Sequence, residues 1–133
     1  MTERLCKHLA LYWFPLVLFC IGIFVMSAHP APQHIPNVPN LDKLLHFTAY
    51  AILGILFYRA LNTLPLKHHI RLLIGVSVLL ACVYGISDEI HQAFVPHRDS
   101  DIMDVLADGL GSVFGVMTYY ILNRRRRVSS GQA

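Results

Sequence analysis

Acidic, histidine and arginine side chains are concentrated in one segment of this sequence, between two apolar stretches. Residues 88–108 read DEIHQAFVPHRDSDIMDVLAD and contain six acids, two histidines and one arginine. Acids beside a membrane-length apolar segment are costly unless they pair, reach water or have a function. A second polar run, residues 42–46, opens the preceding apolar segment. Together the two runs contain the groups needed for general acid–base chemistry, for metal binding or for holding a charged headgroup.

Helical spacing arranges these polar residues in three stripes, because residues three or four positions apart share one face of a helix. The stripes are Asp42, His46 and Tyr50; Asp88, Glu89 and Gln92; and Asp101, Asp104 and Asp108. If consecutive helices alternate in direction, all three stripes lie at the same end of the molecule. We therefore expect one shared site, with His46 and Glu89 as candidate catalytic residues. The candidate ligand-binding residues are Asp42, Lys43, Tyr50, Asp88, Gln92, Arg98, Asp104 and Asp108.

Some of the acids have a simpler interpretation as solvated loop residues. The segment 99–101, Asp-Ser-Asp, suits a loop that ends in a helix N-cap, a position at which Ser and Asp are favoured. That interpretation is weak for Asp88, Asp104 and Asp108, because the apolar pattern places them where helices enter or leave the membrane. These three acids are the better candidates for function.

His46 and Arg98 each have two interpretations. His46 either packs between helices through hydrogen bonds, or acts as a general base or metal ligand, since imidazole titrates near neutral pH. Arg98 pairs either with an acid of a neighbouring helix or with an anionic ligand such as a phosphate. The sequence has no HExxH motif and no closely spaced cysteine pair, so spacing alone identifies no metal or other cofactor.

The apolar composition indicates which elements position these residues. Of 133 residues, 55% are hydrophobic and 14% are charged, and the mean hydropathy is +0.50; an ordinary soluble domain of this length is less apolar. About 20 apolar residues in a helix cross a bilayer, and four segments qualify: 9–28, 44–64, 70–86 and 102–122. The sequence therefore predicts one membrane domain over residues 1–133, an all-α antiparallel bundle of four transmembrane helices with a basic tail at 123–133.

The positions of Lys and Arg predict the orientation of this bundle. Of the 11 Lys and Arg residues, all except Lys43 and Arg98 fall on one side of a four-span arrangement, and such residues stay in the cytoplasm. We expect a multi-pass protein of the cytoplasmic (inner) membrane, with both termini cytoplasmic and the polar site on the extracytoplasmic side. Cleavage of the first span as a signal peptide is less consistent, because residues 27–30, Ser-Ala-His-Pro, are a poor cleavage site.

The cysteines argue against a disulfide-stabilised or cysteine-metal protein, and the position of the arginines argues against a nucleic-acid-binding protein. The three cysteines Cys6, Cys20 and Cys82 are odd in number and two lie inside expected spans, which argues against a disulfide framework and a cysteine metal site. The four arginines at 124–127 directly follow a span, a position typical of an anchor to anionic lipid. The expected partner is the lipid bilayer, not nucleic acid.

The polar motifs, taken together, resemble those of the VanZ-like family of small bacterial membrane proteins. The family pattern has D-K-x-x-H-F-x-x-Y, matched at 42–50, and D-E-x-x-Q, matched at 88–92; an Arg follows, matched by Arg98, and then an Asp, matched by Asp104. Asn is common in the family where this sequence has Asp108, and Gly is usual where it has His97. The resemblance covers about residues 10 to 123.

The resemblance implies an envelope protein at the outer membrane boundary, because the family is named for a protein that gives low-level resistance to the glycopeptide teicoplanin. One hypothesis is a non-catalytic protein that changes how a glycopeptide or a lipid-linked wall precursor sits at the outer leaflet. A second is a hydrolase or transferase acting on a phosphate- or acyl-bearing envelope lipid, with His46 or Glu89 as general base and Arg98 and Lys43 holding the anionic group. Ion transport is a third, although the polar residues gather at one end and provide no path across the membrane.

Overall fold

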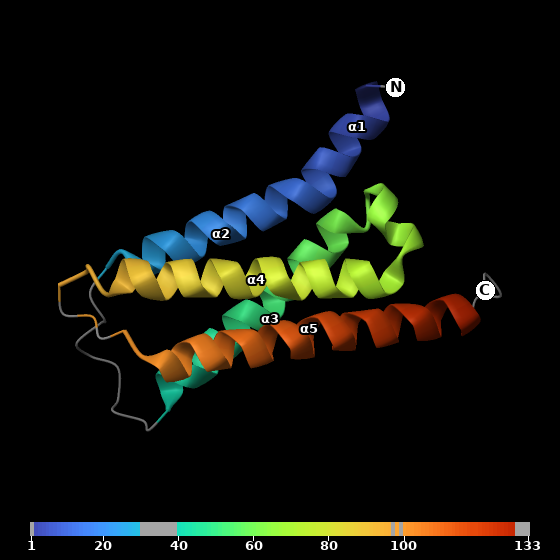
Figure 1. Ribbon diagram of the computed structural model, residues 1–133. Helices are drawn as coiled ribbons and strands as arrows, with labels where there is room; N and C mark the ends of the chain where they lie inside the picture. Colours follow the sequence, from blue (N-terminus) through green and yellow to red (C-terminus); the bar gives the residue numbers. More distant parts are fainter. Residues whose placement is uncertain (1, 30–39, 97, 99, 130–133) are drawn as a thin grey trace.

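The computed structural model describes residues 2–29, 40–96, 98 and 100–129, and these ranges contain helices and no strand. Four helices are long and apolar enough to cross a membrane, judged by length and composition. They cover Cys6–Ser27, Leu41–Leu61, Ile70–Gln92 and Ile102–Arg126. The prediction of an all-α bundle of four membrane-length helices is confirmed (Figure 1). The side of the membrane that each terminus occupies stays a prediction.

The first membrane-length helix is bent near its N-terminal end, as Figure 1 shows. It consists of α1 (Thr2–His8), a π-helical segment (Leu9–Trp13) and α2 (Phe14–Ser27). Pro15 lies in the first turn of α2; because proline has no N–H and its ring crowds the carbonyl of the preceding turn, the regular α-helical pattern cannot pass through it. Trp13 donates a hydrogen bond to Thr63 at 3.2 Å and so ties this helix to the turn after α3.

The other three helices form the close-packed part of the bundle: α3 (Leu41–Leu61), α4 (Ile70–Gln92) and α5 (Ile102–Ser129). The second span was expected to reach residue 64, whereas α3 ends at Leu61 and a short 3-10 helix, Pro65–His68, leads into α4. At the other end α4 continues past 86 to Gln92. Helix α5 also continues past 122, to Ser129, where the basic tail was expected to begin at 123; arginine has a high helix propensity, which explains the longer helix.

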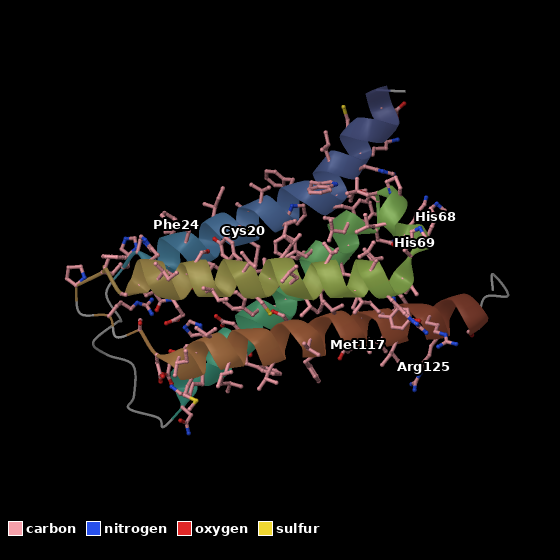
Figure 2. The ribbon with its side chains drawn as sticks, in the orientation of Figure 1. Cys20, Phe24, His68, His69, Met117 and Arg125 are labelled. Carbon is pink, nitrogen blue, oxygen red and sulfur yellow. The ribbon has the colours of Figure 1, made fainter. Side chains whose placement is uncertain are left out.

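Consecutive helices run in opposite directions, so α3 and α5 point the same way (Figure 1). The described chain ends lie at one end of the bundle, and the α4–α5 connection lies at the other. In Figure 2, His68, His69 and Arg125 lie at the end where the chain termini lie. The start of α3, the end of α4 and the start of α5 therefore meet at the opposite end.

Helices α3 and α5 form the most extensive helix pair, and small residues allow it. A Cβ atom at Gly111 would collide with the backbone of Phe47, and one at Gly115 with the backbone of Ala51. A Cβ at Gly54 would lie 2.9 Å from the carbonyl oxygen of Ser112. This is the small-xxx-small packing by which membrane helices approach closely, and it fixes the alignment of the polar residues at the start of each helix.

The distribution of apolar side chains suits a lipid environment. Leu53, Leu73 and Val116 are fully buried between helices, whereas α2 exposes most of its apolar side chains. Figure 2 shows Cys20 and Phe24 on α2 where it runs beside α4, and Tyr84 donates a hydrogen bond to the Cys20 carbonyl at 2.7 Å. Exposed apolar surface on this scale, in four helices long enough to cross a membrane, suits contact with lipid.

Candidate functional site

Three polar side chains from three helices meet at the end of the bundle formed by the α4–α5 connection. His46 of α3 places Nδ1 3.0 Å from Asp108 Oδ1 of α5 and Nε2 3.9 Å from Glu89 Oε1 of α4. Their side chains are 14%, 1% and 6% exposed, respectively. Each offers one ligand-type atom, and these atoms lie within 4.8 Å of one another. We call this group the buried triad.

The buried triad depends on a close approach between α4 and α5. At Gly85, one turn before Glu89, an added Cβ would lie 2.7 Å from Asp108 Oδ2 and 3.1 Å from Tyr50 Cε1. Only a residue without a side chain leaves this space for the Asp108 carboxylate. Tyr50 itself is buried below His46, and the two rings are parallel with centroids 6.4 Å apart.

Several oxygens around the triad are buried without a hydrogen-bond partner in the described chain. They are Glu89 Oε1, Asp108 Oδ2 and the Tyr50 hydroxyl. Buried polar groups in folded proteins are nearly always hydrogen-bonded, and an unpaired one costs free energy of folding. Unpaired oxygens that gather at one place therefore mark a functional site more strongly than buried acids alone.

A lysine and further acids surround the outer side of the triad. Lys43 Nζ lies 2.9 Å from Asp101, 3.2 Å from Asp42 and 3.5 Å from Asp104. Asp104 is buried, whereas Asp42 and Asp101 are partly exposed. With Glu89 and Asp108 included, the acids outnumber the basic groups, so the site attracts cations and hydrogen-bond donors more readily than a free anion.

Asp101 precedes the first residue of α5, where it caps this helix and links it to the neighbouring helices. Its Oδ1 accepts the backbone N–H of Met103 at 2.9 Å, and its own N–H donates to Glu89 Oε2 at 3.2 Å. The sequence offered Ser100 or Asp101 as the cap of the last helix, and the structure shows that Asp101 is the cap. The Lys43 ammonium and the Met103 N–H together hold the pKa of Asp101 below its usual value.

Replacing Asp101 with Asn is expected to lower the unfolding temperature slightly at neutral pH, because Asn still accepts the Met103 N–H but no longer pairs with Lys43. Since the folded-state pKa of Asp101 is depressed, the ion pair stabilises the fold above the usual Asp pKa, and this stabilisation is lost as pH falls through the lowered value. Unfolding temperatures of both proteins in detergent, from neutral pH to below about 3.9, should therefore converge. A difference that does not change with pH would contradict this account.

Arg98 belongs to a second network, between α2 and α4. Its guanidinium donates to the carbonyl oxygens of Met26 at 2.9 Å and His29 at 3.1 Å, and to Gln92 Oε1 at 3.4 Å. Gln92 in turn donates to Asp88 at 2.9 Å and to Ser27 at 3.4 Å. In the described residues Arg98 thus binds carbonyls at and just after the end of α2 and anchors that helix; that it binds an anionic ligand stays a prediction.

The candidate residues predicted from sequence thus fall into two neighbouring networks. The first network is the buried triad and its surroundings, with His46, Glu89, Asp108, Tyr50, Asp104, Lys43 and Asp42. The second is the network that holds α2, with Asp88, Gln92 and Arg98. Two positions from the sequence analysis lie outside the described residues: His97, where the family usually has Gly, and Asp99 of the expected loop. Sequence reasoning placed Asp101 in the third stripe and interpreted it as a helix cap, but left it out of the candidate residues and missed its contacts with Lys43 and Glu89.

Comparison with known proteins identifies a family for most of the chain. A family model described as VanZ/LLP1 matches residues 10–123, a range that includes every residue of the buried triad. An uncharacterized protein of the fission yeast Schizosaccharomyces pombe is 25% identical over 120 residues, which cover 90% of this chain and 70% of that protein. No solved structure matches the chain. Because that relative is fungal, the expectation of a bacterial protein stays a prediction.

Proposed function

This chain belongs to the VanZ/LLP1 family, and on that premise we propose that it binds the polar headgroup of a lipid-linked envelope compound, or a lipophilic glycopeptide, at the outer surface of the cytoplasmic membrane. The consequence for the cell is a lower sensitivity to glycopeptides of the teicoplanin type. The observation that carries the proposal is the buried triad, a cluster of ionisable side chains contributed by three membrane-length helices at one end of the bundle. Intramembrane ionisable groups of this kind are typical of functional sites.

The distribution of basic residues supports the outward placement of this site. Arg125 lies at the end of the bundle opposite the triad (Figure 2), and Lys67 and Arg71 lie at the same end, around the connection from α3 to α4. Positive residues beside spans stay in the cytoplasm, and the acidic end then faces outward. In that orientation the triad lies at the depth of lipid headgroups, within reach of lipid-linked precursors in the outer leaflet.

The fungal relative favours a lipid as the common target. A protein of fission yeast is 25% identical to this chain over 120 residues, and lipids are a component of the membranes of every cell. An activity that both proteins perform would act on a component that both membranes possess. Teicoplanin resistance would then be an indirect effect of altered headgroup exposure in bacteria.

We expect the wild-type chain to raise the inhibitory concentration of teicoplanin in a susceptible bacterial host, with little effect on vancomycin, and Glu89→Gln to abolish this protection. The Gln side chain has nearly the same shape as Glu but lacks the charge in the triad. Ser87→Ala is a matched control on the same helix, because Ser87 is exposed and bonds only to the Tyr84 carbonyl of its own helix. Membrane abundance is equalised by immunoblot, and protection by Glu89→Gln equal to wild type would contradict the proposal.

A second candidate function is hydrolysis or group transfer on an envelope lipid, and one contact favours it. The 3.0 Å contact between His46 Nδ1 and Asp108 fixes the ring with Nε2 directed toward Glu89, which is how carboxylates orient a histidine that acts as general base. Envelope lipid profiles of cells that express the wild type or His46→Ala separate the two functions. A changed lipid species that depends on His46 supports catalysis, whereas protection without any change in lipid composition supports binding.

A further inference from the structure

The composition of the buried triad indicates a cation ligand set. It combines one imidazole and two carboxylates from three different helices, and the ligand-type atoms lie within 4.8 Å of one another. Nitrogen and carboxylate oxygen donors together suit Zn²⁺ or Mn²⁺. Metal ligands need not be close in sequence, so the absence of a short metal motif does not count against such a site.

The unpaired oxygens point independently to a ligand. Glu89 Oε1 faces His46 Nε2 at 3.9 Å, and both Glu89 Oε1 and Asp108 Oδ2 are buried without a hydrogen-bond partner. Two carboxylates held close together in a low-dielectric interior repel each other strongly. A cation between them would neutralise the repulsion and coordinate the unpaired atoms.

The directions of the two ring nitrogens decide which of them could share an ion with Asp108. They point away from each other, so an ion on Nε2 would lie out of reach of Asp108, whereas an ion on Nδ1 would lie beside Asp108 Oδ1, which is 3.0 Å from that nitrogen. The ring proton is then on Nε2, which faces Glu89 Oε1 at 3.9 Å. His46 would therefore bind the ion through Nδ1, with one carboxylate oxygen from each of Asp108 and Glu89.

We propose that His46, Glu89 and Asp108 bind one divalent transition-metal ion, of the Zn²⁺ or Mn²⁺ class. The protein supplies three ligands, so further coordination positions stay open for water or for an oxygen of a headgroup. An acidic site could then hold a phosphate through the ion. This last step rests on the proposed function, whereas binding of the ion does not.

Calorimetric titration of the full chain, purified in detergent without a histidine tag and treated with chelator, tests the site with ZnCl₂ as the probe. The expected result is one Zn²⁺ per chain, with affinity reduced by about tenfold or more in both Glu89→Gln and Asp108→Asn. Asp88→Asn is the matched control, because it removes an equally buried carboxylate next to Glu89 whose partner is Gln92. It should bind Zn²⁺ much as the wild type does.

A second probe, Mn²⁺, allows metal binding to be measured by a spectrum instead of by the heat of binding. The spectrum of bound Mn²⁺ in electron paramagnetic resonance should be present in the wild type and in Asp88→Asn, and absent in the triad variants. Lack of Zn²⁺ and Mn²⁺ binding by the folded wild type would overturn the proposal. So would binding that the triad variants retain but that His68→Ala/His69→Ala loses, because the ion would then sit at the opposite end. Loss of teicoplanin protection has no bearing on these binding measurements.

Discussion

Gly115→Ala is expected to reduce the free energy of unfolding by about 3 kcal/mol, the upper end of the usual cost of overpacking. The added Cβ would collide with the carbonyl group and Cα of Ala51 on α3. Backbone atoms inside a helix cannot move aside as a side-chain tip can, so α3 and α5 must separate along their length. The double variant Gly111→Ala/Gly115→Ala is expected not to accumulate as folded protein.

The chain provides matched controls for this experiment. Gly75 and Gly22 are also in membrane-length helices, but a Cβ at either would meet no atom within 4 Å. Gly75→Ala and Gly22→Ala should be as stable as the wild type or more stable, because alanine favours the helix. The free energy of unfolding is measured by SDS titration in mixed micelles, followed by circular dichroism, for the wild type, Gly115→Ala, Gly75→Ala and Gly22→Ala. If Gly115→Ala unfolded at the same SDS fraction as Gly75→Ala, the close α3–α5 contact would be wrong.

The sequence was sufficient to predict the helices, because their apolar length is a property of contiguous residues. The four spans and the polar stripes at one end both follow from the spacing of residues along the chain. The helix ends were less predictable. The polar residues at 88–92 and the arginines at 124–127 lower local hydropathy, yet both segments continue their helices, since helix formation depends on backbone hydrogen bonds and not on hydropathy.

The partners of individual side chains could not be predicted, because they depend on how each helix is rotated against its neighbours. Arg98 illustrates this, since its acceptors at Met26 and His29 are backbone carbonyls, and every residue has one. Lys43 is similar: its contact with Asp101 joins residues 58 positions apart. The meeting of His46, Glu89 and Asp108 was expected from helix direction alone, but their distances required the structure.

Asp108→Asn is expected to raise the free energy of unfolding by about 1–3 kcal/mol when metal is removed by chelator, the range of the penalty for a buried unpaired polar group. Asp108 is 1% exposed and its Oδ2 has no partner. Asn keeps an oxygen that accepts from His46 Nδ1, and it removes the negative charge of the carboxylate that shares the triad with Glu89. Asp88→Asn should give no such gain, because the Asp88 carboxylate accepts from Gln92 and, unlike Asp108, has no oxygen among the buried unpaired atoms of the described residues.

Asp108→Asn should gain stability and lose Zn²⁺ binding. The variant therefore tests whether this buried acid serves metal binding or helix packing. A buried unpaired charge is destabilising, and sites that carry function often reduce stability in this way. Denaturant unfolding of wild type and variant with chelator, and again with saturating Zn²⁺, separates the two contributions, because a ligand stabilises only the protein that binds it. We expect the variant to be the more stable protein with chelator and Zn²⁺ to stabilise only the wild type. A variant that is less stable in both conditions would show that Asp108 serves the packing of α3 against α5 and not a bound ion.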